Sequence, residues 1–129
     1  MNRLSQVAGI LLCAGLLAAC GAGHRKLSSI SITPTSATAT TASRGTAEFT
    51  AKGIFDDNSS RTLTQADGLT WDTTNHTIAT ISDSGTATCN AVGVVHVVGT
   101  APVDLNLTIS NGIQNTSTKI SGSAQLTCM

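Results

Sequence analysis

The stretch TAEFTAKGIF, residues 46–55, alternates apolar and polar side chains and is typical of a half-buried strand. The apolar set is Ala47, Phe49, Ala51, Gly53 and Phe55, and the polar set is Thr46, Glu48, Thr50 and Lys52. Successive side chains of a strand point to opposite faces of its sheet. This period of two therefore predicts a sheet with one buried face and one solvated face.

The same period recurs on both sides of residues 46–55. Toward the N-terminus, LSSISITP (27–34) places Leu27, Ile30 and Ile32 in an extended run that ends at Pro34. Toward the C-terminus follow LTWDTTN (69–75), HTIATIS (76–82), TATCNAVG (86–93), VVHVVGTA (94–101), DLNLTIS (104–110) and KISGSAQLTC (119–128). About seven to eight short strands with regular turn signals predict an all-β chain folded as an antiparallel sandwich.

Aromatic residues are scarce, with two Phe, one Trp and no Tyr. Large aromatic side chains dominate the core of a small domain when they are buried. We therefore predict that Phe49, Phe55 and Trp71, together with Ile81, belong to the core.

The first twenty residues predict where the protein resides. Residues 7–19, VAGILLCAGLLAA, carry no charge and follow Arg3, but they are shorter than the ~20 residues that span a membrane. A basic start, a short apolar centre and small residues at the end are typical of a secretory signal peptide. We expect a cleavable signal helix over residues 1–19 and a flexible tether over residues 20–26.

LAAC, residues 17–20, resembles the lipobox of bacterial lipoproteins. In that family the cysteine receives diacylglycerol and further fatty acid, and the signal is cut before it. The resemblance implies lipidation of Cys20, a membrane contact through this lipid and an envelope location, at the outer membrane if the cell is Gram-negative. An ordinary secretory signal with a chance cysteine is the alternative.

Three cysteines remain after processing, and with Cys20 carrying the lipid the other two are Cys89 and Cys128. An even pair in an oxidising compartment indicates a disulfide, with free thiols as the alternative. A zinc site needs four closely spaced ligands. No C-x-x-C motif occurs and the three histidines are scattered, so we expect no metal and no cofactor.

Charge and composition argue against several functions. Seven basic and seven acidic residues leave no basic stripe for nucleic acid. DDNSS, residues 56–60, lacks the ligand spacing of a calcium loop and reads as a hairpin turn. No G-x-S-x-G motif surrounds a serine, and His76 and His96 fall in or near strands, so we expect no catalytic residues. A glycan site usually needs an exposed aromatic side chain as a platform. The three aromatic residues of this chain are all expected in the core, so one of them would have to be exposed for glycan binding.

The order of short motifs resembles the bacterial immunoglobulin-like domain group 2 of intimin- and invasin-type surface proteins. The motifs are LSSISITP, GTAEFTAKGIFDDNSSRTLT, LTWDTTNHTIATISDSG and AVGVVHVVGTA, within residues 27–101. The resemblance implies an immunoglobulin-like sandwich. The typical domain of that family ends near Ala101, and we expect residues 102–128 to add strands that complete the same sandwich over residues 27–128. It also implies a non-catalytic surface role in structural or protein contacts, with adhesion or carbohydrate binding as the alternative.

Overall fold

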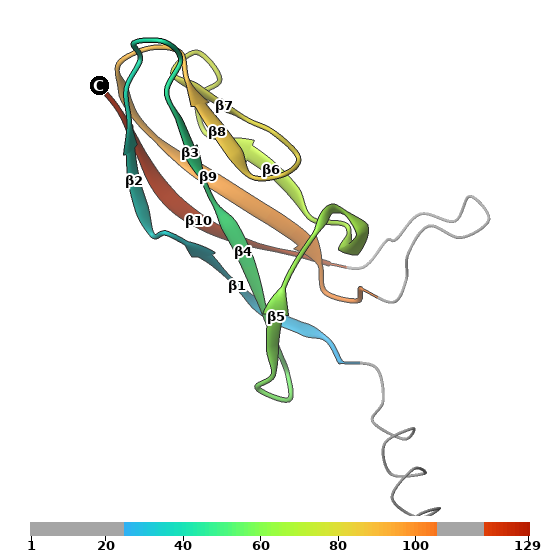
Figure 1. The fold of residues 1–129 in the computed structure, drawn as a ribbon. Coiled ribbons are helices and arrows are strands. Elements are labelled where there is room, and N and C mark those ends of the chain that lie inside the picture. The colour runs from blue at the N-terminus through green and yellow to red at the C-terminus, as the bar shows by residue number, and fades with distance from the viewer. Residues whose placement is uncertain (1–24, 106–117) are drawn as a thin grey trace, which may run out of the picture.

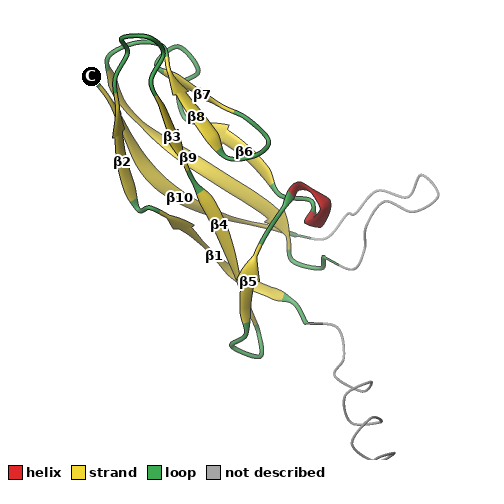
Figure 2. Cartoon of the chain, viewed as in Figure 1, coloured by secondary structure: helices red, strands yellow, loops and turns green. Residues whose placement is uncertain are grey.

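A computed structural model describes residues 25–105 and 118–129 of the protein. Within these residues the chain forms ten strands, one short 3-10 turn and no α-helix (Figure 1, Figure 2). The strands are β1 (Leu27–Thr33), β2 (Ser36–Ala39), β3 (Thr46–Glu48), β4 (Thr50–Phe55), β5 (Ser60–Thr62), β6 (Thr70–Thr73), β7 (Ala79–Ile81), β8 (Thr86–Cys89), β9 (Gly93–Pro102) and β10 (Lys119–Cys128), and the 3-10 turn is η1 (Gln65–Asp67).

Phe49 divides the strand predicted at residues 46–55 into β3 and β4. β4 belongs to a three-stranded sheet of order β1-β4-β5 and β3 to one of order β3-β8-β7; because they adjoin along this strand, we call them together the first sheet. On one side β1 runs antiparallel to β4. On the other side β8 pairs with β3, β5 pairs with β4, and β7 extends the sheet beyond β8. The partner changes within two residues: Phe49 N–H donates to the Gly85 carbonyl at 2.8 Å, and the Ala51 carbonyl accepts from Leu63 N–H at 2.9 Å.

The second sheet has the strand order β2-β10-β9-β6 and faces the first sheet (Figure 1). β9 and β10 are antiparallel, and their register runs from Pro102 opposite Lys119 to Gly93 opposite Cys128. β6 runs antiparallel to β9, whereas β2 runs parallel to β10. Since β2 follows β1 just after the cis peptide Thr33–Pro34, the first part of the described chain contributes to both sheets.

Two facing sheets connected in this way form an immunoglobulin-like antiparallel β-sandwich, so the predicted fold class is confirmed. Two strands of the sandwich are each interrupted by one or two residues, one as β1 and β2 and the other as β3 and β4. Counted in that way, the described residues contain eight strands, which agrees with the number expected from the sequence.

Several predicted features lie outside the described residues. They are the signal helix over residues 1–19, the lipidation site Cys20, most of the tether over residues 20–26, and residues 106–110 of the strand expected over 104–110. None of the described residues belongs to a helix that is long and apolar enough to cross a membrane.

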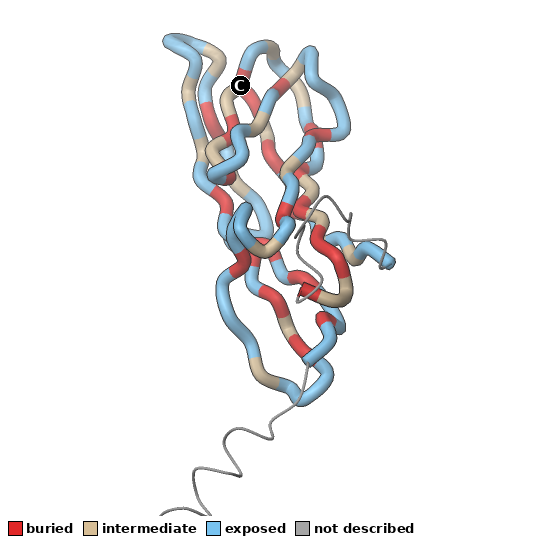
Figure 3. The backbone as a smooth tube through the Cα atoms, turned by 90° about the vertical axis from the view of Figure 1, so that its right-hand side faces the viewer, coloured by how far each residue is buried: buried red, intermediate tan, exposed pale blue. Residues whose placement is uncertain are grey.

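Buried and exposed positions alternate along the strands (Figure 3). In β9, for example, Val95 is buried while the neighbouring His96 is exposed. β1 departs from a strict period of two, because Leu27 and Ile30 are both buried although they are three residues apart. A β-bulge between Leu27 and Ser29 shifts the register and turns both side chains inward.

The core occupies the space between the sheets, and the four residues expected there divide into two groups. Phe49 and Phe55 are buried, at 3% and 4% exposed. Trp71 and Ile81 are partly buried and pack against this core. Both residues lie on edge strands, where solvent reaches them although Thr73 and Ala79, two residues away on the same strands, are buried.

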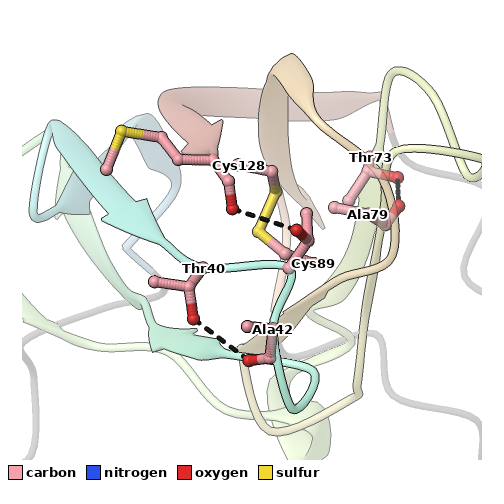
Figure 4. Close-up of a disulfide and its surroundings, with 8 residues drawn as sticks. Thr40, Ala42, Thr73, Ala79, Cys89 and Cys128 are labelled. Atoms are coloured by element: carbon pink, nitrogen blue, oxygen red, sulfur yellow. Dashed lines mark hydrogen bonds between the residues drawn. A yellow bond between two sulfur atoms is a disulfide. The ribbon is translucent and has the colours of Figure 1, made fainter.

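The predicted disulfide between Cys89 and Cys128 is present, and the Cα atoms of the two residues are 5.6 Å apart (Figure 4). Cys89 ends β8 in the first sheet and Cys128 ends β10 in the second. The bond therefore joins the two sheets at one end of the sandwich. Both side chains are at most 1% exposed, so the sulfur atoms also contribute to the core.

Replacing both cysteines, Cys89→Ala with Cys128→Ala, is expected to lower the free energy of unfolding by about 2–5 kcal/mol, since the unfolded chain regains the freedom of a closed loop. Alanine is chosen because a buried serine hydroxyl would add its own penalty. Urea unfolding measures the change. A reducing agent should destabilise the unsubstituted chain similarly and leave the double variant unaffected; equal stability of all samples would contradict the role given to this bond.

Candidate functional site

A groove of about 720 Å³ opens on the side of the sandwich where β5 and η1 approach the turn between β7 and β8. Its floor consists of Phe49, Ala51, Leu63, Leu69 and Trp71. Its rim consists of Thr50, Thr62, Thr64, Gln65, Ser82, Asp83 and Ser84. We call these residues the Trp71 groove. They come from four separate parts of the chain, so only the folded protein assembles them.

The floor of the groove is apolar, and Trp71 is its partly exposed member. Phe49 and Leu63 beneath it are each 3% exposed. A Cβ atom added at Gly85 would lie 3.3 Å from Cε2 and Cζ2 of the indole, and one added at Gly99 would lie 3.4 Å from Cζ3. Gly85 also has a φ of +88°, which glycine adopts without strain. Backbone thus packs directly against the indole and fixes the position of the ring.

The rim of the groove is polar and exposed to solvent. Nε2 of Gln65 donates to Oδ2 of Asp83 at 3.5 Å, a long hydrogen bond that joins the two walls. Next to it, the hydroxyl oxygens of Ser82 and Ser84 are 2.8 Å apart and share a hydrogen bond. A ligand with hydroxyl groups has donors and acceptors within reach here, and the Gln65 contact is weak enough to be replaced.

Gln65 is held in place because η1 is anchored to β5. Asp67 accepts from the backbone N–H of Thr64 at 2.9 Å, which caps the turn. It also accepts two hydrogen bonds from Arg61, at 2.9 and 2.8 Å. The hydrogen bonds from Arg61 lower the pKa of Asp67 below its ordinary value of 3.8, and the pKa of Arg61 is raised by the same partner.

Asp83 lies at the tip of the tight turn between β7 and β8. Gly85 N–H donates to the Ser82 carbonyl at 3.0 Å, and Ser82 N–H donates to the Thr86 carbonyl at 2.9 Å. Thr86 N–H in turn donates to Oγ of Ser82 at 3.2 Å. These bonds fix the turn at both ends, so the Asp83 carboxylate projects from a defined position beside the groove.

The groove combines an aromatic platform with neutral polar groups and one carboxylate. Asp83 is the one charged side chain among the described residues that line it, and histidine, cysteine and lysine are missing from that set. The lining offers no nucleophile paired with a base. Stacking on the indole and hydrogen bonding at the rim are therefore the interactions that this site provides.

The predicted turn at residues 56–60 is a hairpin turn between β4 and β5. Oδ1 of Asp57 accepts from the backbone N–H of Ser59 at 3.0 Å and from the Ser59 hydroxyl. Both bonds lower the pKa of Asp57 below its ordinary value, and the bond from the Ser59 hydroxyl has the larger effect. The carboxylate thus stabilises its own turn. Among residues 25–105 and 118–129, no three histidine, cysteine or acidic side chains gather in a group that would hold a metal ion.

The histidines considered for catalysis lie on the surface. Nε2 of His76 contacts Oδ1 of Asp72, and both side chains are more than two thirds exposed. The hydrogen bond from His76 lowers the pKa of Asp72. In the part of the chain that the structure describes, no serine hydroxyl bonds to His76. His96 is exposed on β9. His76 and Asp72 therefore form a hydrogen bond on the surface, without the serine nucleophile that a catalytic triad among the described residues would need.

The Trp71 groove is a site that sequence reasoning missed. The sequence predicts Trp71 as a core residue, and neither Asp83 nor Gln65 is among the predicted site residues. No short motif links these positions, because the groove depends on which strands become neighbours. No protein-family model and no curated protein matches the chain, so the groove is interpreted from its own chemistry.

Replacing Asp67 with Asn should make stability less dependent on pH in acid. The folded-state pKa of Asp67 is lowered, so its contribution is fully present above 3.8 and is lost as pH falls through the folded-state value. Urea unfolding between about pH 7 and pH 2.5 measures this. The variant should lose about 1–2 kcal/mol at neutral pH and show a shallower decline below about pH 4.

Arg61→Gln serves as the matched variant, because it removes the same pair from the other side. It should also flatten the acid decline, and the double variant should lose less than the sum of the single losses. A full acid decline in Asp67→Asn would show that Asp67 does not carry the effect.

Proposed function

We propose that this chain is a non-catalytic lipoprotein of the cell envelope whose immunoglobulin-like module makes contacts with a partner protein. The observation that carries this proposal is the placement of the two ends. The described chain enters β1 at one end of the sandwich, and Cys128 lies at the opposite end (Figure 1). A lipid on Cys20 would hold the module by its first strand and direct the disulfide end away from the bilayer.

The length of the tether sets how far the module stands from the membrane. Seven residue steps separate Cys20 from Leu27, and an extended chain spans at most about 3.5 Å per residue. The first strand would therefore start within about 25 Å of the lipidated cysteine. A module held this closely suits contacts with other envelope components.

The end that points away from the bilayer in this arrangement exposes apolar side chains. Val92 is 73% exposed, Val94 54% and Met129 62%. They are near one another, since Cys128 pairs with Gly93 across β9 and β10. Exposed apolar side chains that gather in one place are typical of surfaces that contact other proteins. Edge strands such as β2 add backbone groups with which another strand can pair.

The resemblance of residues 27–101 to the bacterial immunoglobulin-like domain group 2 supports the same reading, because the fold that it implies agrees with the observed sandwich. Glycan recognition is the second candidate function. It is favoured by one observation, the partial exposure of Trp71 among polar side chains. We expect no nucleic-acid partner, since the charge is balanced.

The lipid anchor is tested on the chain expressed in its own envelope, by intact mass and by labelling with an alkyne fatty acid. The unsubstituted chain should begin at Cys20 and carry the label, whereas Cys20→Ser should retain residues 1–19 and carry none. Cys13→Ser is the matched control, because it changes a cysteine in the removed segment and should leave the mature mass intact. An unmodified Cys20, or cleavage elsewhere, would remove the anchor.

The protein contact is tested by placing a photo-crosslinking amino acid at Val92 in living cells. A discrete adduct is expected there, and Val94→Ser should reduce its yield about fivefold or more, since it removes apolar contact area. The same crosslinker at Asn58, in the turn between β4 and β5, is the control and should give no such adduct. Adducts at Asn58 without adducts at Val92 would contradict the proposed orientation.

A further inference from the structure

We propose that the Trp71 groove binds a neutral glycan, with one pyranose ring seated on the indole of Trp71. This inference rests on the second candidate function proposed above, glycan recognition, and depends neither on the lipid anchor nor on the protein contact at Val92. It is carried by an aromatic ring that is fixed by backbone, partly open to solvent and bordered by polar side chains.

The shape of the groove suits a sugar. Its volume of about 720 Å³ falls in the range of ordinary small-molecule sites, roughly 300–1,000 Å³. A pyranose ring has an apolar C–H face and a periphery of hydroxyl groups. The groove has the complementary arrangement, because its floor is apolar around Trp71 and its rim carries Gln65, Asp83 and the serine pair of the 82–84 turn.

The rim provides both kinds of hydrogen-bonding group that a sugar needs. The Gln65 amide donates and accepts, and the Asp83 carboxylate accepts from hydroxyl groups. These two side chains contact each other only at 3.5 Å, so a sugar hydroxyl placed between them would replace a long bond with two shorter ones. Binding of this hydroxyl would replace only the Gln65–Asp83 hydrogen bond at the rim and would leave the core packing unchanged.

The charge of the groove selects neutral over acidic sugars. Asp83 is the one charged side chain among its described lining residues, so a uronic acid would bring a second carboxylate close to the first. Like charges at such a distance repel, and partial exclusion of water strengthens the repulsion. Neutral hexoses and N-acetylhexosamines avoid this penalty.

The site is built before any ligand arrives. Gly85 and Gly99 leave room for the indole, and the Arg61–Asp67 pair anchors the turn that carries Gln65. A site that needs little ordering retains more of its interaction energy as affinity. Strand addition by a peptide is disfavoured here, because Phe49 N–H and the Ala51 carbonyl, which face this side of the central strand, already have partners.

Trp71 is the single tryptophan of the chain, so its fluorescence reports on this groove alone. The chain as purified from its own cells, held in a zwitterionic detergent that contains no sugar, is titrated with three trisaccharides. Cellotriose and chitotriose are the neutral probes, and trigalacturonate is the acidic probe. We expect a saturable change in emission with at least one neutral trimer, and binding of the acidic trimer weaker by about tenfold or more.

Substitutions then assign the binding to the groove, with calorimetry as the readout because the two Trp71 variants lack the fluorophore. Trp71→Ala should abolish measurable binding, and Gln65→Ala should weaken it about fivefold to tenfold. Asp83→Asn should reduce the discrimination against trigalacturonate. His96→Ala, on the exposed side of β9, is the matched control and should bind as the unsubstituted chain does.

Trp71→Phe keeps an aromatic ring and serves as the folding-neutral variant, with thermal unfolding checked for each protein. It should retain weaker binding at nearly unchanged stability. The inference is overturned if neither neutral trimer binds saturably, if binding survives Trp71→Ala, or if trigalacturonate binds best. A negative result here leaves the outcomes for Cys20 and Val92 unaffected, so failure of the glycan site and failure of the envelope role are told apart.

Discussion

The central strand over residues 46–55 sets the arrangement of the rest of the sandwich. One edge of this strand pairs with β1, and the other edge is shared by β8 and β5 in succession. The neighbouring strand on this edge therefore changes between Phe49, which bonds to Gly85, and Ala51, which bonds to Leu63. At that change the side of the sandwich opens, and Trp71 from the opposite sheet is reached from outside. The groove is thus a consequence of strand pairing.

The two ends of the sandwich are secured by different means. At one end Cys89 and Cys128 join the sheets covalently, and around them the apolar surface includes Val92 and Val94. The opposite end receives the incoming chain at β1 and carries the hairpin turn of residues 56–60. The covalent link joins β8 of one sheet to β10 of the other, while β1 and β2, which follow each other in the chain, pair with strands of different sheets.

The local features of this fold were predictable because each depends on residues close in sequence. The alternation in residues 46–55 specifies which side chains turn inward whatever the neighbouring strands are. The turn at residues 56–60 was equally clear, since Asp57 caps it with a bond two residues away. The disulfide was predictable because Cys89 and Cys128 are the one pair of cysteines left once Cys20 carries the lipid. The exposure of Trp71 was not predictable, because an edge strand and a central strand have the same alternation.

By itself, the sequence determined the strand pattern, the inward faces and the pair of cysteines that join, because these follow from a period of two and from covalent chemistry. Only the tertiary structure decided that β6 and β7 are edge strands, that the backbone at Gly85 and Gly99 approaches the indole of Trp71, and that Gln65 meets Asp83. The physical reason is that strand order is a long-range property. It depends on the packing of whole sheets, and no stretch of neighbouring residues encodes it alone.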